Sequence, residues 1–329
     1  MSELRELVLK NLQQEGHISG EILGKRLKIS RTAVWKHIKE LRKRGYQIEA
    51  SRKFGYSFVK STTLLLPEEI KLGLNTRIMG KQVVHFDEIS STQDVAAELA
   101  IEGGAEGTLV VAEMQTRGRG RRGRNWASIS SGGIYFSLIL RPKLMPSKVV
   151  QIPLIASVAL TKAIGETAPI QPKIKWPNDL YINTKKVGGI LTEMNSEIDA
   201  VNYVILGIGL NVNMSASLFD KDISKIATSL IDECGVYISR AKLVQNFLSE
   251  FEQIYTKYLA YGFGSVRDEW KAFNNTIGSQ VKISDGAKDI EGEAVDINNE
   301  GFLLVRKKNG DITRIISGDV SLNNPVQKA

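Results

Sequence analysis

The chain has 329 residues, a hydrophobic content of 42% and a formal net charge of +8. The hydrophobic content is ample for globular cores, and the length predicts two or three domains. The single Cys234 excludes an intrachain disulfide and is typical of a reducing cytosol, so we expect a cytoplasmic protein.

The sequence also argues against a membrane-associated protein and against a structural zinc site. Charged residues occur within the first few positions, so no signal peptide is visible, and the longest apolar stretch, residues 149–160, contains Gln151 and Pro153 and is too short to span a bilayer. The three histidines are far apart, without metal-ligand spacing. We therefore expect no membrane association and no structural zinc.

The excess positive charge lies entirely at the start of the chain. Residues 1–60 contain 14 Lys and Arg against 6 Asp and Glu, whereas residues 61–329 contain 30 of each. This asymmetry predicts a separate basic module with an acidic partner such as nucleic acid.

The first module, residues 1–63, is predicted to be a winged helix-turn-helix. Leu4, Leu7, Val8 and Leu12 form the apolar stripe of a first helix, and residues 19–27 form a second. Ser30 is placed to cap a third, basic helix with an inward stripe of Val34, Ile38 and Leu41. Trp35 and Tyr46 are expected in the core.

Two alternating strands around residues 51–54 then complete a wing. Helix, turn, basic helix and wing together predict operator DNA as a partner; the alternative is a basic helical bundle that binds protein. The expected DNA contacts are Ser30, Arg31, Thr32, Lys36, Lys39, Arg52 and Lys53.

Residues 64–275 alternate strand and helix patterns and predict a mixed α/β domain, after a linker at residues 61–63. The expected strands are 83–86, 108–114, 134–140, 174–176, 186–195 and 202–212, and the expected helices are 91–102, 147–166 and 239–261. Residues 276–329 contain short strands at 280–283, 290–297, 301–306 and 312–317, with turns at 285–286, 298–301 and 309–311, which predicts a small SH3-like β-barrel.

One arginine-glycine loop carries the strongest functional signal. Gly118-Arg119-Gly120-Arg121-Arg122-Gly123-Arg124, followed by Trp126, lies between two apolar strands and can neutralise a phosphate or a charged intermediate. The loop also reads as the dinucleotide pattern G-x-G-x-x-G, but a β-strand pattern without an acidic residue follows it, so we reject that interpretation. The alternative is a solvated, disordered run.

Further clusters lie in the central domain. Ser91, Thr92 and Gln93 precede a helix and supply hydroxyls and an amide, although an N-cap alone would also explain them. Gln115 precedes the loop. Lys175-Trp176-Pro177-Asn178-Asp179 places an Asn and an Asp at a strand end, where an Asx turn is the alternative. Glycine pairs in Lys185-Lys186-Val187-Gly188-Gly189-Ile190-Leu191 and Gly207-Ile208-Gly209-Leu210-Asn211 indicate close approach by a ligand or backbone.

Together these motifs resemble the biotin–protein ligases, specifically the form that is also a biotin operon repressor. The resemblance covers nearly the whole chain, and the arginine loop with Lys-Trp-Pro-Asn-Asp is its most specific part. It implies a multidomain α+β protein whose central domain is similar to class II aminoacyl-tRNA synthetases. Many relatives carry Asn where this chain has Gln93.

The resemblance implies the site residues. The implied catalytic residues are Lys186, Arg121 and Arg119. The implied biotin contacts are Ser91, Thr92, Gln93, Gln115, Arg119, Gly120, Arg121, Lys186, Gly188, Gly207 and Gly209. The implied ATP and adenylate contacts are Gly118, Arg121, Arg122, Arg124, Trp126, Asn178, Asp179 and Asn211, with Asp179 as a ligand of Mg²⁺.

The implied reaction has two steps. Biotin and ATP form biotinyl-5′-adenylate and pyrophosphate, and a lysine of a biotin carboxyl carrier protein then takes the biotinyl group and releases AMP. The resemblance also implies a homodimer when the adenylate is bound, and repression by that dimer. Three alternatives stay open: a lipoate–protein ligase, a repressor that uses a degenerate ligase domain as a biotin sensor, and a ligase whose N-terminal module does not bind DNA.

Overall fold

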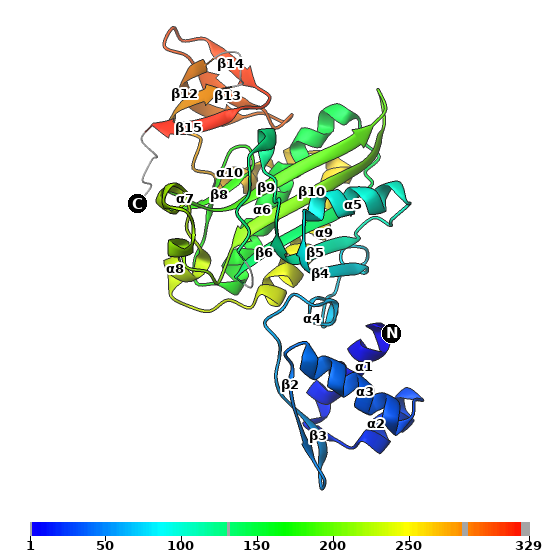
Figure 1. Ribbon diagram of the computed structural model, residues 1–329. Helices are drawn as coiled ribbons and strands as arrows, with labels where there is room; N and C mark the ends of the chain where they lie inside the picture. The colour runs from blue at the N-terminus through cyan, green and yellow to red at the C-terminus, as the bar shows by residue number, and fades with distance from the viewer. Residues whose placement is uncertain (1, 130–131, 285–288, 324–329) are drawn as a thin grey trace. The chain divides into compact units, whose positions relative to one another are not determined.

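The computed structural model describes residues 2–129, 132–284 and 289–323. Contacts divide the chain into two compact units, Met1–Leu74 and Asn75–Ala329 (Figure 1).

The first unit is the predicted winged helix-turn-helix. A three-stranded sheet of order β1-β3-β2 accompanies its helices, and Ser19 and Ser30 cap α2 and α3 as N-caps. Its elements are α1 (Ser2–Glu15), β1 (His17–Ile18), α2 (Gly20–Leu27), α3 (Arg31–Lys43), β2 (Gln47–Ser51), β3 (Gly55–Lys60) and α4 (Pro67–Lys71).

The core of this unit confirms the inward stripe of α3 and corrects two other expectations. Val34, Ile38 and Leu41 are buried. Leu7 is 44% exposed and Leu9 takes its place in the core, because α1 turns residues 8, 9 and 12 toward α3. Trp35 is 49% exposed, not buried, because it lies about 100° around the helix from Val34.

The first unit extends beyond residue 63. Leu66 packs in the same core as the three helices, and α4 follows it. Buried Glu68 of α4 lies 3.3 Å from Arg5 and 3.3 Å from Arg44. The compact unit therefore ends at Leu74 rather than at the expected linker.

The second unit is built on a seven-stranded sheet of order β4-β5-β6-β10-β9-β8-β7. In the sheet as described, β4 and β5 are parallel and the other neighbouring strands are antiparallel. Asn178 and Asp179 follow the carboxyl end of β7 as expected, and Asp179 is the first residue of the antiparallel strand β8. The strands are β4 (Val83–Ile89), β5 (Leu109–Gln115), β6 (Gly133–Leu140), β7 (Lys173–Lys175), β8 (Asp179–Ile182), β9 (Lys185–Ser196) and β10 (Val201–Asn211).

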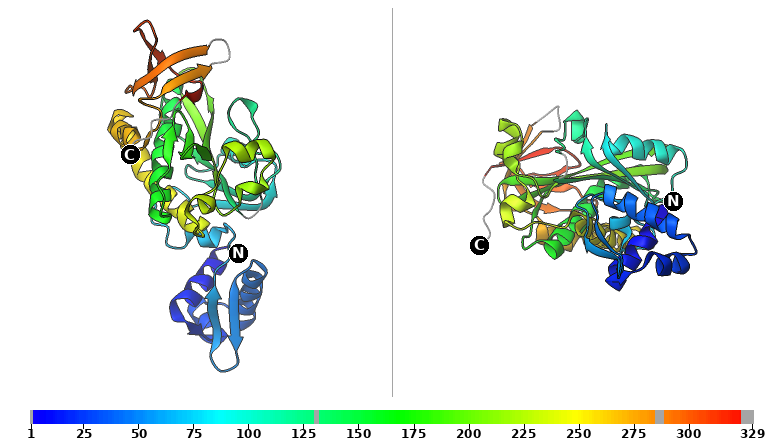
Figure 2. Two further views of the ribbon diagram at one scale, coloured as in Figure 1. Left: turned by 90° about the vertical axis from the view of Figure 1, so that its left-hand side faces the viewer. Right: turned by 60° about the horizontal axis from the view of Figure 1, so that its bottom comes forward.

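Helices cover the two faces of this sheet differently (Figures 1 and 2). Phe136 of β6 packs on Phe247 of α9, whereas the next residue, Ser137, contacts Gln93 of α5 on the opposite face. The face with α5 is left partly open and forms the site described below. The helices of the unit are α5 (Thr92–Ile101), α6 (Ile152–Thr167), α7 (Lys221–Ile226), α8 (Leu230–Cys234), α9 (Arg240–Tyr261) and α10 (Gly264–Phe273), with short 3-10 turns at Arg121–Gly123, Pro146–Gln151 and Ala216–Leu218.

The apolar stretch judged too short for a membrane is longer in the structure. The turn Pro146–Gln151 continues into α6, and by length and composition the 22-residue segment could cross a bilayer. However, 72% of its apolar window is buried inside the molecule, and its buried residues include Leu154, Val158 and Leu160. The segment is placed as a core helix.

The C-terminal strands form the expected small β domain. The five antiparallel strands have the order β14-β13-β12-β11-β15, and β15 was missed by the sequence patterns. The strands are β11 (Gln280–Ser284), β12 (Asp289–Ile297), β13 (Leu303–Arg306), β14 (Ile312–Ile315) and β15 (Asp319–Asn323). The predicted turn at 285–286 lies outside the described residues.

Glu252 of α9 anchors the segment before β4. Its carboxylate accepts hydrogen bonds from the backbone N–H groups of Arg77 at 2.7 Å, Ile78 at 2.7 Å and Met79 at 3.0 Å. Desolvation opposes ionisation, but the three donors outweigh it and hold the pKa of Glu252 below its ordinary value of 4.5.

We predict that Glu252→Gln lowers the free energy of unfolding at pH 7 by about 2 kcal/mol, because hydrogen bonds to a charged acceptor are lost. The carboxylate contributes stability above its unfolded pKa, and this stability is lost as pH falls through the lower folded pKa. Urea unfolding should therefore show a difference between wild type and variant that shrinks below pH 4.5. Glu102→Gln, at an exposed position after α5, is the control; an equal effect there would contradict the prediction.

Candidate functional site

A cavity of about 430 Å³ lies on the open face of the seven-stranded sheet. The start of α5, the arginine loop, the β7–β8 turn, the glycine-containing parts of β9 and β10, and the start of β15 line it. The predicted residues that line it are Ser91, Thr92, Gln93, Gln115, Arg119, Gly120, Arg121, Arg124, Trp126, Asn178, Asp179, Lys186, Gly207, Gly209 and Asn211.

One end of the cavity is formed by hydrogen-bonded polar side chains, which we call the floor: Ser91, Thr92, Gln93, Gln115 and Ser137. Ser91 is the N-cap of α5, and it also lines the cavity. The Gln115 Oε1 atom accepts from the backbone N–H of Thr92 at 2.8 Å, and the Thr92 hydroxyl lies 2.8 Å from that of Ser137. Ser137 in turn donates to the Gln93 Oε1 atom at 2.8 Å. All of these groups are buried or half-buried, so the floor presents hydroxyls and amides in fixed positions.

The glycines of β9 and β10 make room for side chains of the chain itself. A Cβ at Gly207 would lie 2.6 Å from Gln93 Oε1, and one at Gly209 would lie 2.5 Å from the Trp126 ring. Gly189 is covered by Trp126 and Lys186 in the same way. The indole of Trp126 therefore lies flat on the sheet over Gly189 and Gly209.

Three predicted residues do not line the cavity. Gly188 faces the opposite side of the sheet, where a Cβ would lie 2.9 Å from Leu210 Cδ1. Adjacent residues of a strand point to opposite faces, so Gly188 and Gly189 cannot both face a ligand. Gly118 is held against the Trp126 carbonyl, and Arg122 points toward the C-terminal β domain.

Most arginines of the loop are paired with carboxylates. Arg119 forms ion pairs with Asp94 and, at 2.9 Å, with Glu193. Arg124 pairs with Asp319 of β15, and Arg122 lies 3.5 Å from the same carboxylate. These pairs tie the loop to α5 and β9 on one side and to the C-terminal β domain on the other.

Two cations of the cavity lack such a partner. Within residues 2–129, 132–284 and 289–323, neither Arg121 nor Lys175 lies within 4.0 Å of a carboxylate. Arg121 donates instead to Asn178 Oδ1 at 3.0 Å, and Lys175 to the Tyr181 hydroxyl at 3.3 Å. Desolvation lowers the pKa of both groups from their ordinary values. A buried cation without a counter-ion favours an anionic ligand.

Lys186 supplies a third positive charge. Its Nζ atom lies 2.6 Å from Asp179 Oδ1 and 5.5 Å from the centroid of the Trp126 ring. Both polar atoms of the Asn178 side chain are hydrogen-bonded: Oδ1 accepts from Arg121, and Nδ2 donates to the Ile190 carbonyl at 2.6 Å. These two hydrogen bonds fix the β7–β8 turn.

Two buried polar atoms of the cavity wall have no hydrogen-bond partner within the described part of the chain: Trp126 Nε1 and Asn211 Oδ1. Buried polar groups in folded proteins are rarely left unsatisfied. Both atoms are enclosed by the protein, and a Cβ at Gly209 would lie 2.8 Å from Trp126 Nε1, so that atom faces the sheet. The site combines a hydrogen-bonding floor with cations that have no ion-pair partner among the described residues, which suits a ligand that is polar at one end and anionic at the other.

Comparison with known proteins identifies the family. The Biotin/lipoate A/B protein ligase family matches residues 85–211, the HTH domain family matches residues 4–57, and the biotin protein ligase C-terminal domain matches residues 276–323. The bifunctional ligase/repressor BirA of Bacillus subtilis (strain 168) is 44% identical over 98% of this chain and 99% of its own.

The chain belongs to the biotin protein ligase family.

The same relationship extends to more distant bacteria and to solved structures. The bifunctional ligase/repressor BirA of Escherichia coli (strain K12) is 29% identical over 93% of each chain. The biotin protein ligase from Aquifex aeolicus in complex with biotin and ATP superposes with a TM-score of 0.64 and 31% identity, covering 74% of this chain and 99% of that one. Both expectations of fold and family are thereby confirmed.

Several cavity residues of this ligase were missed from the sequence. Lys175 was part of a recognised motif without an assigned role, and Ser137 and Tyr181 lie in strands with no polar pattern to mark them. Glu193 and Asp319 contact the arginine loop from far along the chain. Only its place in the Lys-Trp-Pro-Asn-Asp motif marked Lys175 beforehand.

The N-terminal unit of the ligase presents the predicted basic residues to solvent. Arg31, Thr32, Lys36 and Lys39 of α3 are exposed, as are Arg52 and Lys53 between β2 and β3. The hydroxyl of Ser30 accepts from the backbone N–H of Ala33 at 3.1 Å as the helix cap.

Proposed function

We propose that the cavity binds biotin and ATP, forms biotinyl-5′-adenylate and passes the biotinyl group to a lysine of a biotin carboxyl carrier protein. The observation that carries this assignment is the pairing of a hydrogen-bonding floor with Arg121 and Lys175, which have no ion-pair partner among the described residues. The floor suits the ureido ring of biotin, and the cations suit the carboxylate and the phosphates. The solved relative with biotin and ATP bound supports both substrates.

The residues act mainly by positioning and by charge. A carboxylate and a triphosphate repel each other, so the reaction needs cations where they meet. Lys186 lies next to the cavity's aromatic wall and can turn from Asp179 to the biotin carboxylate. Arg121 and Lys175 supply further positive charge, and neither forms an ion pair with a carboxylate of the described residues. No covalent nucleophile is required, because orientation of the reactants provides much of the acceleration.

We further propose that Mg²⁺ enters with the ATP phosphates at Asp179. The described residues contain no group of three His, Cys, Asp or Glu side chains that could hold a metal alone. A single carboxylate fits Mg²⁺, which usually binds through one or two carboxylates and substrate phosphates. The ion would neutralise phosphate charge.

The direct test is incubation of the purified chain with biotin, ATP and a carrier domain. Mass analysis should detect biotinyl-adenylate and a carrier heavier by one biotinyl group. Lipoate in place of biotin should give neither product. Transfer of lipoate, or adenylate absent with both acids, would contradict the assignment.

We predict that Lys175→Met raises the KM for ATP about tenfold with a smaller effect on the KM for biotin, because a desolvated cation near the phosphates is lost. Pyrophosphate release at varied ATP concentration measures this. Lys173→Met, an exposed position two residues earlier in β7, is the matched control. Equal changes in the KM values for ATP and biotin would show that Lys175 does not act mainly on the ATP phosphates.

We also propose that the N-terminal unit binds operator DNA and represses transcription as a dimer when the adenylate is bound. The exposed basic residues of α3 and the wing support this, as do the ligase/repressor relatives. A dimer would present two recognition helices to two half-sites. We place the protein in the cytoplasm, where carrier and DNA are both available.

For DNA binding, we predict that Lys36→Ala makes the dependence on salt less steep. The slope of the logarithm of the DNA association constant against log salt concentration should fall in magnitude by about 1, because one phosphate contact is lost. Fluorescence anisotropy with duplex DNA selected from a random pool gives the slope. Lys10→Ala, at an exposed position on α1, should leave it unchanged. Sedimentation of the chain with biotin and ATP tests the dimer.

A further inference from the structure

Glu193 of β9 connects the arginine loop to the floor of the cavity. Its Oε2 atom accepts from Arg119 Nη2 at 2.9 Å and from Gln93 Nε2 at 3.0 Å. Arg119 belongs to the loop and Gln93 to the floor, so one carboxylate oxygen joins the two halves of the site. Glu193 is not itself a lining residue of the cavity.

The charge of Glu193 sets the direction of the hydrogen bonds in the floor. An ionised carboxylate only accepts, so Gln93 must turn its NH₂ group toward Glu193 and its Oε1 atom toward Ser137. Ser137 must then donate its single hydroxyl proton to Gln93. The Thr92 hydroxyl is left to donate to Ser137 or to Gln115 Oε1, which lies 3.1 Å away. Both hydroxyl oxygens thereby keep lone pairs free to accept from a ligand.

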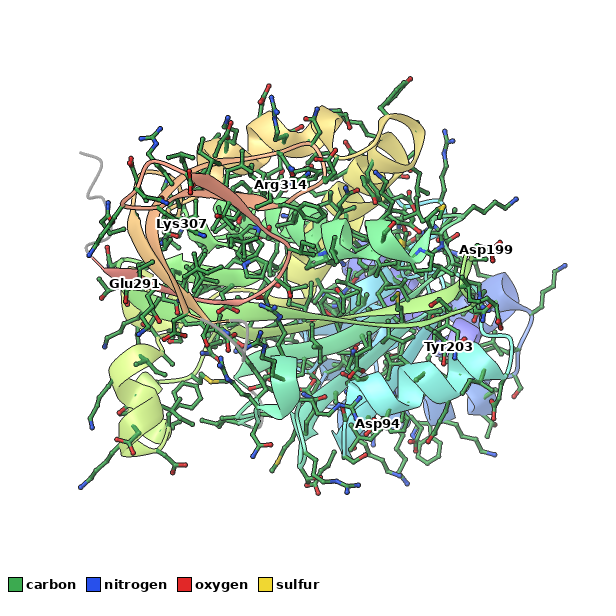
Figure 3. The ribbon with its side chains drawn as sticks, turned by 90° about the horizontal axis from the view of Figure 1, so that it is seen from above. Asp94, Asp199, Tyr203, Glu291, Lys307 and Arg314 are labelled. Atoms are coloured by element: carbon green, nitrogen blue, oxygen red, sulfur yellow. The ribbon has the colours of Figure 1, made fainter. Side chains whose placement is uncertain are left out.

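Arg119 is held by carboxylates on two different elements. Its second partner is Asp94 of α5, which Figure 3 labels on that helix. Desolvation opposes the charge, but Glu193 and Asp94 outweigh it and hold the pKa of Arg119 above its ordinary value. With both carboxylates engaged, Arg119 anchors the loop and contributes little free charge to the cavity.

We propose that Glu193 is a positioning residue that sets the hydrogen-bond polarity of the biotin floor and, through Arg119, couples occupation of that floor to closure of the arginine loop. Asp94 shares only the second task, because it contacts Arg119 and not Gln93. This inference rests on biotin lying on the floor, as proposed above. It assigns to Arg119 the role of a tether rather than of a catalytic cation.

The two carboxylates allow a matched experiment. In Glu193→Gln the side chain keeps its shape but can donate as well as accept, so Gln93 loses its fixed orientation. We expect the KM for biotin in adenylate formation to rise about tenfold, the KM for ATP to stay unchanged, and release of the adenylate to accelerate. In Asp94→Asn we expect faster release with the KM for biotin unchanged. Release of the labelled adenylate from the protein is measured by a chase with unlabelled biotin and ATP.

A double-mutant cycle tests the route through Gln93. In a Gln93→Met background, Glu193→Gln should add nothing further to the KM for biotin, because the amide that it orients is absent. Additive effects would overturn the proposal, as would an unchanged KM for biotin in Glu193→Gln or an equal rise in Asp94→Asn. Absence of adenylate with the wild-type chain would instead contradict the proposed function itself.

Discussion

Lys186→Ala is expected to lower the rate of biotinyl-adenylate formation by about 10²- to 10³-fold, the range found when a preorganised charge-stabilising group is removed. The lysine lies 2.6 Å from the Asp179 carboxylate and beside the Trp126 ring. A biotin carboxylate can replace Asp179 as the partner of the lysine. Pyrophosphate release under single-turnover conditions gives the rate.

The loss of Lys186 has a second effect that must be separated from the first. Asp179 is left without its partner and would repel both substrates. The double variant Lys186→Ala/Asp179→Asn removes this repulsion, so it should recover part of biotin binding but not the rate. Full recovery of the rate in the double variant, or retained pyrophosphate release in Lys186→Ala, would refute the role of the lysine. Folding of the N-terminal unit should be unaffected in both variants.

The second large effect is expected for Arg121→Gly. The variant should still form the adenylate, but release and hydrolysis of the adenylate should accelerate by about tenfold or more. The half-buried guanidinium donates to Asn178 Oδ1 at 3.0 Å and to the Gly318 carbonyl at 3.4 Å. It therefore holds the loop against the β7–β8 turn and the C-terminal β domain at once, and shields a reactive mixed anhydride from water.

The measurement is biotin transfer to a protein that is not a natural acceptor, together with AMP formation without acceptor. Arg124→Gln is the matched control: it keeps the loop's backbone preferences, and its side chain is 66% exposed and bonded only to Asp319 in the described structure. We expect a smaller increase in release there. Unchanged release and hydrolysis in Arg121→Gly would show that the loop does not shield the intermediate.

The sequence predicted the elements with strong periodicity and the motifs that carry charge. The stripe of α3, the N-cap of Ser30 and the long α9 follow from local patterns, and the structure confirms them. Alternation also contained information that was overlooked: in a β-strand only one residue of the pair Gly188-Gly189 can face a ligand. Trp35 is a similar case, since one helical step moves it away from the buried stripe.

Other features could not be predicted from local patterns because they depend on contacts across the chain. Nothing near Arg119 indicates that its partners are Asp94 and Glu193, which lie 25 and 74 residues away. The sequence showed four arginines in one loop, but only the fold shows which of them is left without a carboxylate. Arg121 and Lys175 lack an ion-pair partner among the described residues, and Asp179 and Asp319 act on them only at longer range, which is therefore a structural result.

The carboxylate of Asp319 has a consequence for protein engineering. It is the first residue of β15, yet it binds Arg122 and Arg124 from a loop that precedes β6 in the chain. Chimeras that exchange the C-terminal β domain between relatives will therefore need a compatible acid at position 319 and a compatible loop. Otherwise the grafted domain will fold without holding the arginine loop, and the adenylate will be less well shielded from water.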